Sequence, residues 1–421
     1  MLVKISGLLT AVWALRGATM LCKFVLTIFA AKALTLSEFG AYGLLTAGVA
    51  TAVYVLGLQF YVFNLREIAS SNSPLAHTRF IRGQLRFHFT AYGLFAGIFI
   101  LFSFVGDFSA VGYEWLRWLL PLAITEHFSQ EGYRFLIAIS RGYVANVIFF
   151  IRSGSWAIFW VVYASQNKTA SFDQLCLFWL CGSAASVVAT CYVLRRLPWS
   201  VAAREPLGWK WIKKGIRVSA VYMVIVLCYA VTQYVARYIL NASIGANAVG
   251  IFYFFVSMAT PVITFMETGP YALLQPGMLK ARADGALQEY SKTLRIMSVS
   301  ILAGAIILTV GVAGVTILYI HSTGRAELNA NIEVFAWVCC ATILNCFSLI
   351  PQAHLFALGA DKPILIVNVI TTIIAVIVSC FAVPAWGVIG AGFTAVITGA
   401  AMLGLMTFFA LNRRDMVQGL S

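Results

Sequence analysis

The sequence has few charged residues: lysine, arginine, aspartate and glutamate together make up 10% of its 421 positions. A soluble chain of this length would carry about 25% charge, because its surface has to be solvated by water. Hydrophobic residues make up 61% instead. The scarcity of charge therefore excludes a water-soluble globular protein.

Period-two alternation of apolar and polar residues is also missing, which excludes the strand pattern of a membrane barrel. The apolar residues occur in runs of about 18 to 26, long enough to cross the hydrocarbon layer as helices. We therefore predict an all-α integral membrane protein with about twelve transmembrane helices. The expected spans are residues 8–33, 40–64, 87–106, 115–139, 142–165, 172–194, 217–240, 248–274, 293–318, 333–357, 363–384 and 387–411.

Catalytic and metal-binding motifs are absent as well: there is no Walker-type glycine loop, no GxSxG and no HExxH. The nine cysteines lie inside apolar runs without zinc or redox spacing, which is typical of small packing residues and not of disulfides. We expect no enzyme, no catalytic residue, no metal and no cofactor, so that function must depend on residues among the helices.

The basic residues are distributed unevenly over the expected loops: twenty lie on the side of the N-terminus and four on the other. By the positive-inside rule, both termini are predicted to be cytoplasmic. The net charge of +14 therefore reflects topology, and no nucleic-acid partner is expected. Residues 195–217 carry seven basic residues beside three tryptophans, which suits either an in-plane segment on an anionic leaflet or a plain positive-inside anchor.

This basic segment divides the chain into an N-terminal six-helix bundle (1–197), a cytoplasmic linker (198–216) and a C-terminal six-helix bundle (217–421). Residues 39–42 (FGAY) start the second span as residues 249–252 (VGIF) start the eighth, 210 positions later. Six spans per half would give both halves the same orientation, so we expect a parallel pseudo-repeat.

Eight charged residues lie in the interior of the expected spans, at least three residues from either end, where each costs about 2.5–3.5 kcal/mol if it faces lipid. Five are positive and three negative, so two cations would lack partners even if all the others were paired. An anionic substrate is the simplest resolution. The candidate substrate-binding cations are Arg16, Lys23, Arg134, Arg152 and Arg237, and the candidate coupling or pairing carboxylates are Glu126, Glu131 and Glu267.

Each of these residues also has a structural interpretation. Arg237 is near the end of its span and can extend to the interface. Arg134 can pair with Glu131, three residues before it. Glu267 precedes Gly269-Pro270 and can mark a broken helix. The residues that can form ion pairs between helices instead of binding substrate are Arg16, Lys23 and Arg152.

Four segments resemble junctions of the Wzx-type polysaccharide flippases. Residues 34–42 (LTLSEFGAY) are similar to the family's "LGPEEFGLY", and residues 237–252 to its "DRxxLGxxLGAEAVGIY". Residues 386–392 (WGVIGAG) resemble "fGiiGAAxA", and residues 355–359 match the end of span ten. These matches bracket nearly the whole chain, although the family's Asp before Arg is Ala236 here and its proline in the first junction is absent.

The resemblance implies a MATE-like fold of two six-helix bundles with alternating access. It implies export of an undecaprenyl-pyrophosphate-linked oligosaccharide across the bacterial inner membrane, for O-antigen, capsule or exopolysaccharide synthesis. The expected partners are this lipid-linked oligosaccharide and membrane lipids. H+ or Na+ as the coupling ion, and contacts with other polysaccharide assembly proteins, stay open, and Ala236 removes one acidic coupling position.

Two alternative functions would require other features in the sequence. A multidrug or toxin antiporter of the same superfamily would favour an acidic cavity for organic cations, whereas these spans are net basic. A membrane glycosyl polymerase or transferase would need catalytic carboxylates in an outer loop, where this sequence has only scattered ones.

Overall fold

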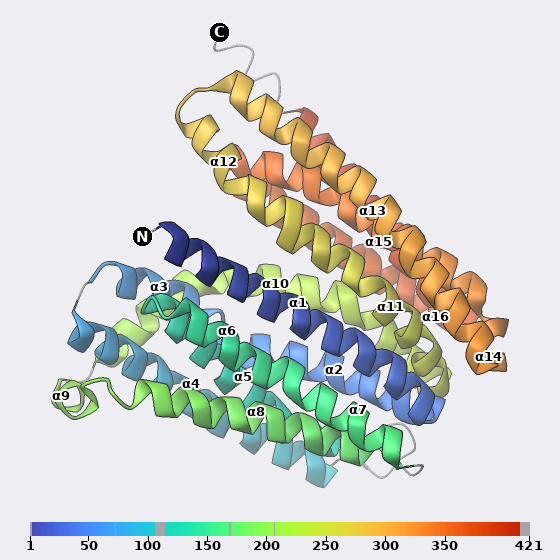
Figure 1. Cartoon of the computed structure of the whole chain (residues 1–421), viewed down its shortest axis with the longest axis horizontal. Coiled ribbons are helices and arrows are strands. Elements are labelled where there is room, and N and C mark those ends of the chain that lie inside the picture. The colour runs from blue at the N-terminus through green and yellow to red at the C-terminus, as the bar shows by residue number, and fades with distance from the viewer. Residues whose placement is uncertain (1, 72, 106–113, 168–169, 206, 413–421) are drawn as a thin grey trace. The chain divides into compact units, whose positions relative to one another are not determined.

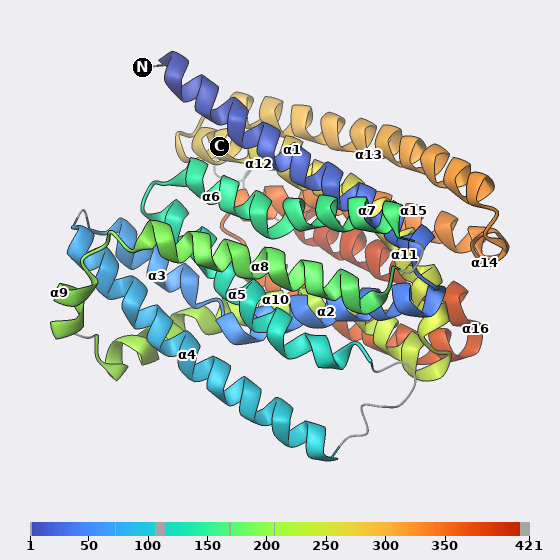
Figure 2. The same ribbon diagram turned by 60° about the horizontal axis from the view of Figure 1, so that its bottom comes forward.

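The structure, a computed structural model, describes residues 2–71, 73–105, 114–167, 170–205 and 207–412, and every regular element among them is a helix (Figures 1 and 2). The predicted all-α class is therefore confirmed. The helices group into two compact units, residues 1–227 and 228–421, with the boundary inside α10 (Trp209–Ser243).

The first unit is built around α5. Its elements are α1 (Leu2–Ala33), α2 (Leu36–Gly57), α3 (Phe60–Ala69), α4 (Pro74–Val105), α5 (Leu116–Ala138), α6 (Gly142–Phe150), the π-helical turn η1 (Ile151–Ser155), α7 (Trp156–Gln166), α8 (Phe172–Leu194), α9 (Trp199–Arg204) and the first part of α10. Helix α5 contacts α2, α3, α4, α6 and α8. Helix α1 lies along α6, η1 and α7, as both views show (Figures 1 and 2).

The second unit is held by mutual packing of α11, α13 and α15. Its elements are the rest of α10, α11 (Ala246–Met266), the π-helical turn η2 (Glu267–Tyr271), α12 (Ala272–Ala283), α13 (Leu287–Thr323), α14 (Ala326–Ala330), α15 (Ile332–Ala357) and α16 (Asp361–Leu411). Val262, Met297, Ile301 and Cys346 form part of its apolar core.

Helix α16 is a hairpin of two helical arms. Gly387, with φ 59° and ψ −129°, interrupts it in a conformation that favours glycine. The chain reverses there, since Thr371 Oγ1 on one arm lies 3.9 Å from Met402 Sδ on the other. The two expected spans 363–384 and 387–411 are the arms of this hairpin.

Nine described segments are long and apolar enough to cross a membrane, which supports a multi-pass membrane protein. They are Ala11–Ala33, Leu36–Gly57, Gly142–Gln166, Phe172–Leu194, Tyr222–Ser243, Ala246–Ala283, Leu287–Thr323, Ile332–Ala357 and Asp361–Leu411. The expected span 115–139 coincides with α5, which is not among the nine because charged residues recur along its length. The expected span 87–106 lies on α4, and its last residue falls outside the described part of the chain.

One expected span is interrupted. Residues 40–64 were predicted as one helix, but the chain leaves the helical conformation at Leu58 and Gln59, which have φ of 44° and 53°. Helix α2 therefore ends at Gly57 and α3 begins at Phe60. Left-handed backbone at residues other than glycine is uncommon, and no glycine, proline or asparagine at 58 or 59 indicates this break.

Capping boxes mark the starts of α2 and α8, and α2 and α11 begin in the register of the predicted repeat. Thr35 and Glu38 form a capping box at the start of α2, and Glu38 Oε1 also accepts from the Phe172 backbone N–H at 3.2 Å, which ties the starts of α2 and α8 together. Phe39 is the fourth residue of α2 and Val249 the fourth of α11, and both are fully buried. The two similar segments thus occupy the same helical register.

Candidate functional site

Several charged residues of the first unit lie in its interior in two clusters, and Glu126 is at the centre of the first. Its carboxylate lies 2.9 Å from Arg152 Nε. The same carboxylate accepts hydrogen bonds from Trp179 Nε1 at 2.7 Å and from Ser183 Oγ at 2.5 Å, both on α8. Glu126 is thus a buried anion satisfied by one cation and two neutral donors.

Arg152 reaches Glu126 from the π-helical turn η1. A π turn inserts one extra residue into a helix, which redirects the side chains it carries, and such turns are frequent at functional sites. Gly154 lies in the same turn, where an added Cβ would press on the Phe150 ring at 2.8 Å and would make an ordinary contact with the Thr19 Cα at 3.5 Å. The turn thus carries Arg152 to Glu126 and also lies against α1.

Glu131 organises a second buried cluster, which reaches from α5 to α4 and α3. Arg134 forms an ion pair with it, and Gln84 donates a hydrogen bond to it. Asn64 donates in turn to Gln84. The Arg134 guanidinium also lies over the Tyr61 ring, 3.6 Å from its centre. This pairing is the structural interpretation that the sequence left open for Arg134.

Two histidines extend this second cluster. His127 Nε2 lies 3.8 Å from Glu131 Oε1, and His127 Nδ1 is hydrogen-bonded to the Tyr92 hydroxyl at 2.7 Å. The His88 ring packs edge-on against His127, with 4.6 Å between the ring centres. Glu131 therefore has both a paired arginine and a neighbouring imidazole within reach.

Arg16 and Lys23 on α1 differ from Arg134 and Arg152, the other two candidate cations of this unit. Arg16 Nε donates to Asn146 Oδ1 at 3.0 Å, and its Nη2 donates to the Tyr133 hydroxyl at 2.7 Å, so its partners are neutral. Lys23 is exposed, and it is attracted by Glu126 and repelled by Arg152. In the described part of the chain, neither residue forms an ion pair with a carboxylate.

The remaining two candidates, Arg237 and Glu267, belong to the second unit. Arg237 is 6% exposed and lies between two aromatic rings, those of Tyr234 and Tyr253, at 5.2 and 5.0 Å. Its burial argues against the expectation that it extends to the interface. Glu267 is exposed and begins the π-helical turn η2, so the helix is irregular at Gly269-Pro270, as the sequence suggested.

The neutral members of both clusters were not identified from the sequence: Asn64, Gln84, His88, Tyr92, His127, Tyr133, Asn146, Trp179 and Ser183. Polar residues inside apolar runs, such as Asn64, Gln84 and Asn146, were the available signal. No described group of three or more His, Cys, Asp or Glu side chains could hold a metal ion.

No protein-family model and no curated protein matches the chain. Solved structures match over nearly its whole length. An inward-facing multidrug resistance MATE family transporter of the MOP superfamily is 13% identical, with 96% of each chain covered and a TM-score of 0.76. The lipid II flippase MurJ, in an inward closed conformation, is 9% identical over 94% of this chain and 86% of its own, with a TM-score of 0.73.

A third structure is a MOP superfamily transporter from Pyrococcus furiosus, described as having a reverse polarity of the binding pocket that suggests a different function. It is 13% identical over 97% of this chain and 96% of its own, with a TM-score of 0.61. At these identities the likeness concerns the fold alone. The chain has the fold of the MOP superfamily transporters.

Proposed function

We propose that this protein is a flippase that moves an undecaprenyl-pyrophosphate-linked oligosaccharide from the cytoplasmic to the periplasmic leaflet of a bacterial inner membrane. The product would serve O-antigen, capsule or exopolysaccharide synthesis. Both termini would be cytoplasmic, and an H+ or Na+ gradient would drive alternating access. We also propose that residues 1–197 form the first six-helix bundle, residues 198–216 a cytoplasmic linker and residues 217–421 the second six-helix bundle.

The observation that carries the proposal is the excess of positive charge on α1. In the first unit Arg152 pairs with Glu126 and Arg134 pairs with Glu131. Arg16 and Lys23 remain as two cations that form no ion pair in the described part of the chain. Two unneutralised charges at membrane depth are costly unless an anion or water compensates them.

A pyrophosphate suits this arrangement chemically. Arginine presents a planar fork that holds phosphate oxygens bidentately, whereas lysine acts as a compact point charge. Asn146 and Tyr133 orient the Arg16 guanidinium without neutralising it, since both are uncharged hydrogen-bond partners. Arg16 would therefore bind the phosphates and Lys23 would add long-range attraction.

The fold is compatible with more than one cargo, because the similar structures include both a multidrug resistance transporter and a lipid II flippase. The positive charge on α1 distinguishes between a cationic drug and a lipid-linked anion as the cargo. An organic cation would be repelled by the excess on α1, whereas a lipid pyrophosphate would be attracted. Glu131, buried between Arg134 and His127, is the best-placed carboxylate for coupling, and Glu126 and Glu267 are the other candidates.

The test is translocation of a lipid-linked oligosaccharide in proteoliposomes, with and without pH and sodium gradients. Arg16→Ala and Lys23→Ala should lose most of the activity, Arg16→Lys should keep part of it, and Arg16→Glu should be worse than alanine. Lys32→Ala is the matched control, since Lys32 is an exposed cation at the end of the same helix. Transport of cationic dyes but no lipid-linked oligosaccharide would replace this proposal with the antiporter.

A further inference from the structure

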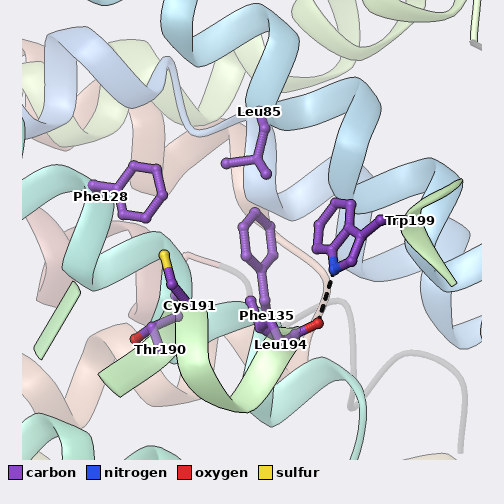
Figure 3. A pocket seen from close by; sticks show the side chains of 8 residues that line it. Leu85, Phe128, Phe135, Thr190, Cys191, Leu194 and Trp199 are labelled. Atoms are coloured by element: carbon purple, nitrogen blue, oxygen red, sulfur yellow. Dashed lines mark hydrogen bonds between the residues drawn. The ribbon is translucent and has the colours of Figure 1, made fainter. Parts of the chain in front are cut away.

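A cavity of about 220 Å³ lies in the first unit between α4, α5, α8 and α9 (Figure 3). Its walls are mainly apolar: Leu85 comes from α4, Phe128 and Phe135 from α5, Leu194 from α8 and Trp199 from α9. The volume is below the roughly 300 Å³ at which pockets for drug-sized ligands begin. The cavity is therefore too small for most drug-sized ligands.

The polar groups that border the cavity are already satisfied. Trp199 Nε1 donates to the Leu194 carbonyl at 2.8 Å, the bond drawn in Figure 3. Thr190 Oγ1 donates to the Ser186 carbonyl at 2.8 Å within its own helix. Water in a cavity needs about two to four polar partners, and apolar cavities stay dry. An apolar occupant is therefore favoured over water.

The cavity borders the outer, apolar face of α8. Cys191, which lines it, is exposed, and its neighbours Val188 and Tyr192 are 68% and 59% exposed. These three residues share one helical face, because they are spaced three and four positions apart. Arg195 follows seven positions after Val188 and ends the same face. An acyl chain lying on this face would have its head group at Arg195.

The end of this face carries basic residues, and the adjoining helix α9 is held by hydrogen bonds. Arg195 and Arg196 are exposed, and the Arg195 guanidinium lies 3.8 Å from the centre of the Tyr192 ring. Helix α9 is fixed to α4 by Arg82, whose Nη1 donates to the carbonyls of Ala202 and Ala203 at 3.1 and 3.2 Å. The Trp199 wall of the cavity is therefore held in place.

We infer that this cavity and the adjoining arginines form a binding site for one anionic phospholipid. An acyl chain occupies the cavity beside Cys191, and the phosphate of the head group contacts Arg195 and Arg196. Basic residues near a membrane surface favour anionic lipids, whereas a zwitterionic lipid would gain little from them. The site gives the basic segment 195–217 a role in lipid recognition that is independent of the transported substrate.

The cavity is tested by filling it. Cys191→Trp places an indole in the space, and Cys181→Trp is the control, because Cys181 is exposed on the same helix and does not line the cavity. Gly132, another lining residue, is unsuitable, since an added Cβ would press on Thr190. Native mass spectrometry of protein purified in mild detergent should show one retained phosphatidylglycerol or cardiolipin in the wild type and in Cys181→Trp, and at least a tenfold loss in Cys191→Trp.

The head-group contact is tested by charge removal. The double variant Arg195→Ala, Arg196→Ala should bind added phosphatidylglycerol on the order of thirtyfold more weakly, since each basic residue contributes about 1 kcal/mol of attraction. Lys280→Ala with Lys292→Ala removes the same charge from exposed positions of the second unit and should leave this binding unchanged.

Three outcomes would overturn the inference: undiminished retention in Cys191→Trp, a retained lipid that is zwitterionic, or a retained polyprenyl lipid. If Cys191→Trp does not fold, the rate at which a maleimide modifies Cys191, in a variant without the other cysteines, replaces it. In detergent, added phosphatidylglycerol should slow this modification, and it should leave the modification of Cys181 in the matching variant unchanged. Neither measurement involves transport, so failure here is distinguishable from failure of the flippase proposal.

Discussion

Arg152 Nε lies 2.9 Å from Glu126 Oε2, so that an ion pair joins the π-helical turn η1 to the middle of α5. The two side chains are only 16% and 10% exposed. Removing one partner of a buried pair leaves the other charge uncompensated, which costs about 3–5 kcal/mol. An exposed ion pair contributes about 0–1 kcal/mol.

We therefore expect Arg152→Gln to lower the apparent melting temperature in detergent on the order of 10 °C. The double variant with Glu126→Gln should recover much of this loss, because no lone charge remains. Arg117→Gln is the matched control, since its partner is Asp173 and both side chains are at least half exposed. Equal effects of Arg152→Gln and Arg117→Gln in scanning fluorimetry would contradict the buried pair.

A second prediction separates substrate binding from internal pairing at Arg16. Its hydrogen-bond partners are the neutral Asn146 and Tyr133. Exchanging the charges of Arg16 and a glutamate therefore restores no ion pair of the described structure. Arg16→Glu combined with Glu126→Arg or Glu131→Arg should not restore transport, measured at matched expression. If either double variant does restore it, Arg16 has a structural role and the proposed phosphate contact is wrong.

A third prediction concerns the close contact between α2 and α5. A Cβ on Gly57 would lie 2.8 Å from Nε2 of His127, whose side chain is fully buried against His88. Gly57→Ala should therefore destabilise the protein by about 1–3 kcal/mol through overpacking. Gly93→Ala, where an added Cβ meets nothing within 4 Å, should be neutral or slightly stabilising in the same thermal assay. The opposite order would contradict the packing of His127.

A fourth prediction tests the hairpin of α16. Gly387 has φ 59° and ψ −129°, a conformation that is strained for any residue with a Cβ. Gly387→Ala should lower thermal stability by about 1–3 kcal/mol. Gly404→Ala, on the second arm of the hairpin with open space around it, is the control and should have little effect. A neutral Gly387→Ala would mean that the turn is made differently.

A fifth prediction concerns topology. Reporter fusions after Ser73 and after Arg204 should be cytoplasmic, and a fusion between α7 and α8 periplasmic, because the basic loops lie on one side. A periplasmic signal from the Arg204 fusion would reverse the whole assignment.

The sequence alone determined the class of the protein. Long apolar runs with little charge have one stable solution in a membrane, since every backbone group must be hydrogen-bonded within its own helix. The short break between the expected spans 363–384 and 387–411 was enough to place the two arms of the last hairpin. The excess of positive charge within the expected spans could also be counted without a structure, because insertion of a charge into the membrane is costly.

Only the tertiary structure decided which charges are compensated. Hydrophobic periodicity indicates the face on which a residue lies but not the neighbour it meets, and ion pairs depend on distances of a few ångströms between distant segments. The left-handed break at Leu58 and Gln59 and the π turn that carries Arg152 left no local signal either, because packing against other helices imposes them. Arg152 and Arg134 thus have carboxylate partners, whereas Arg16, with an equal charge in the sequence, is hydrogen-bonded to the neutral Asn146 and Tyr133.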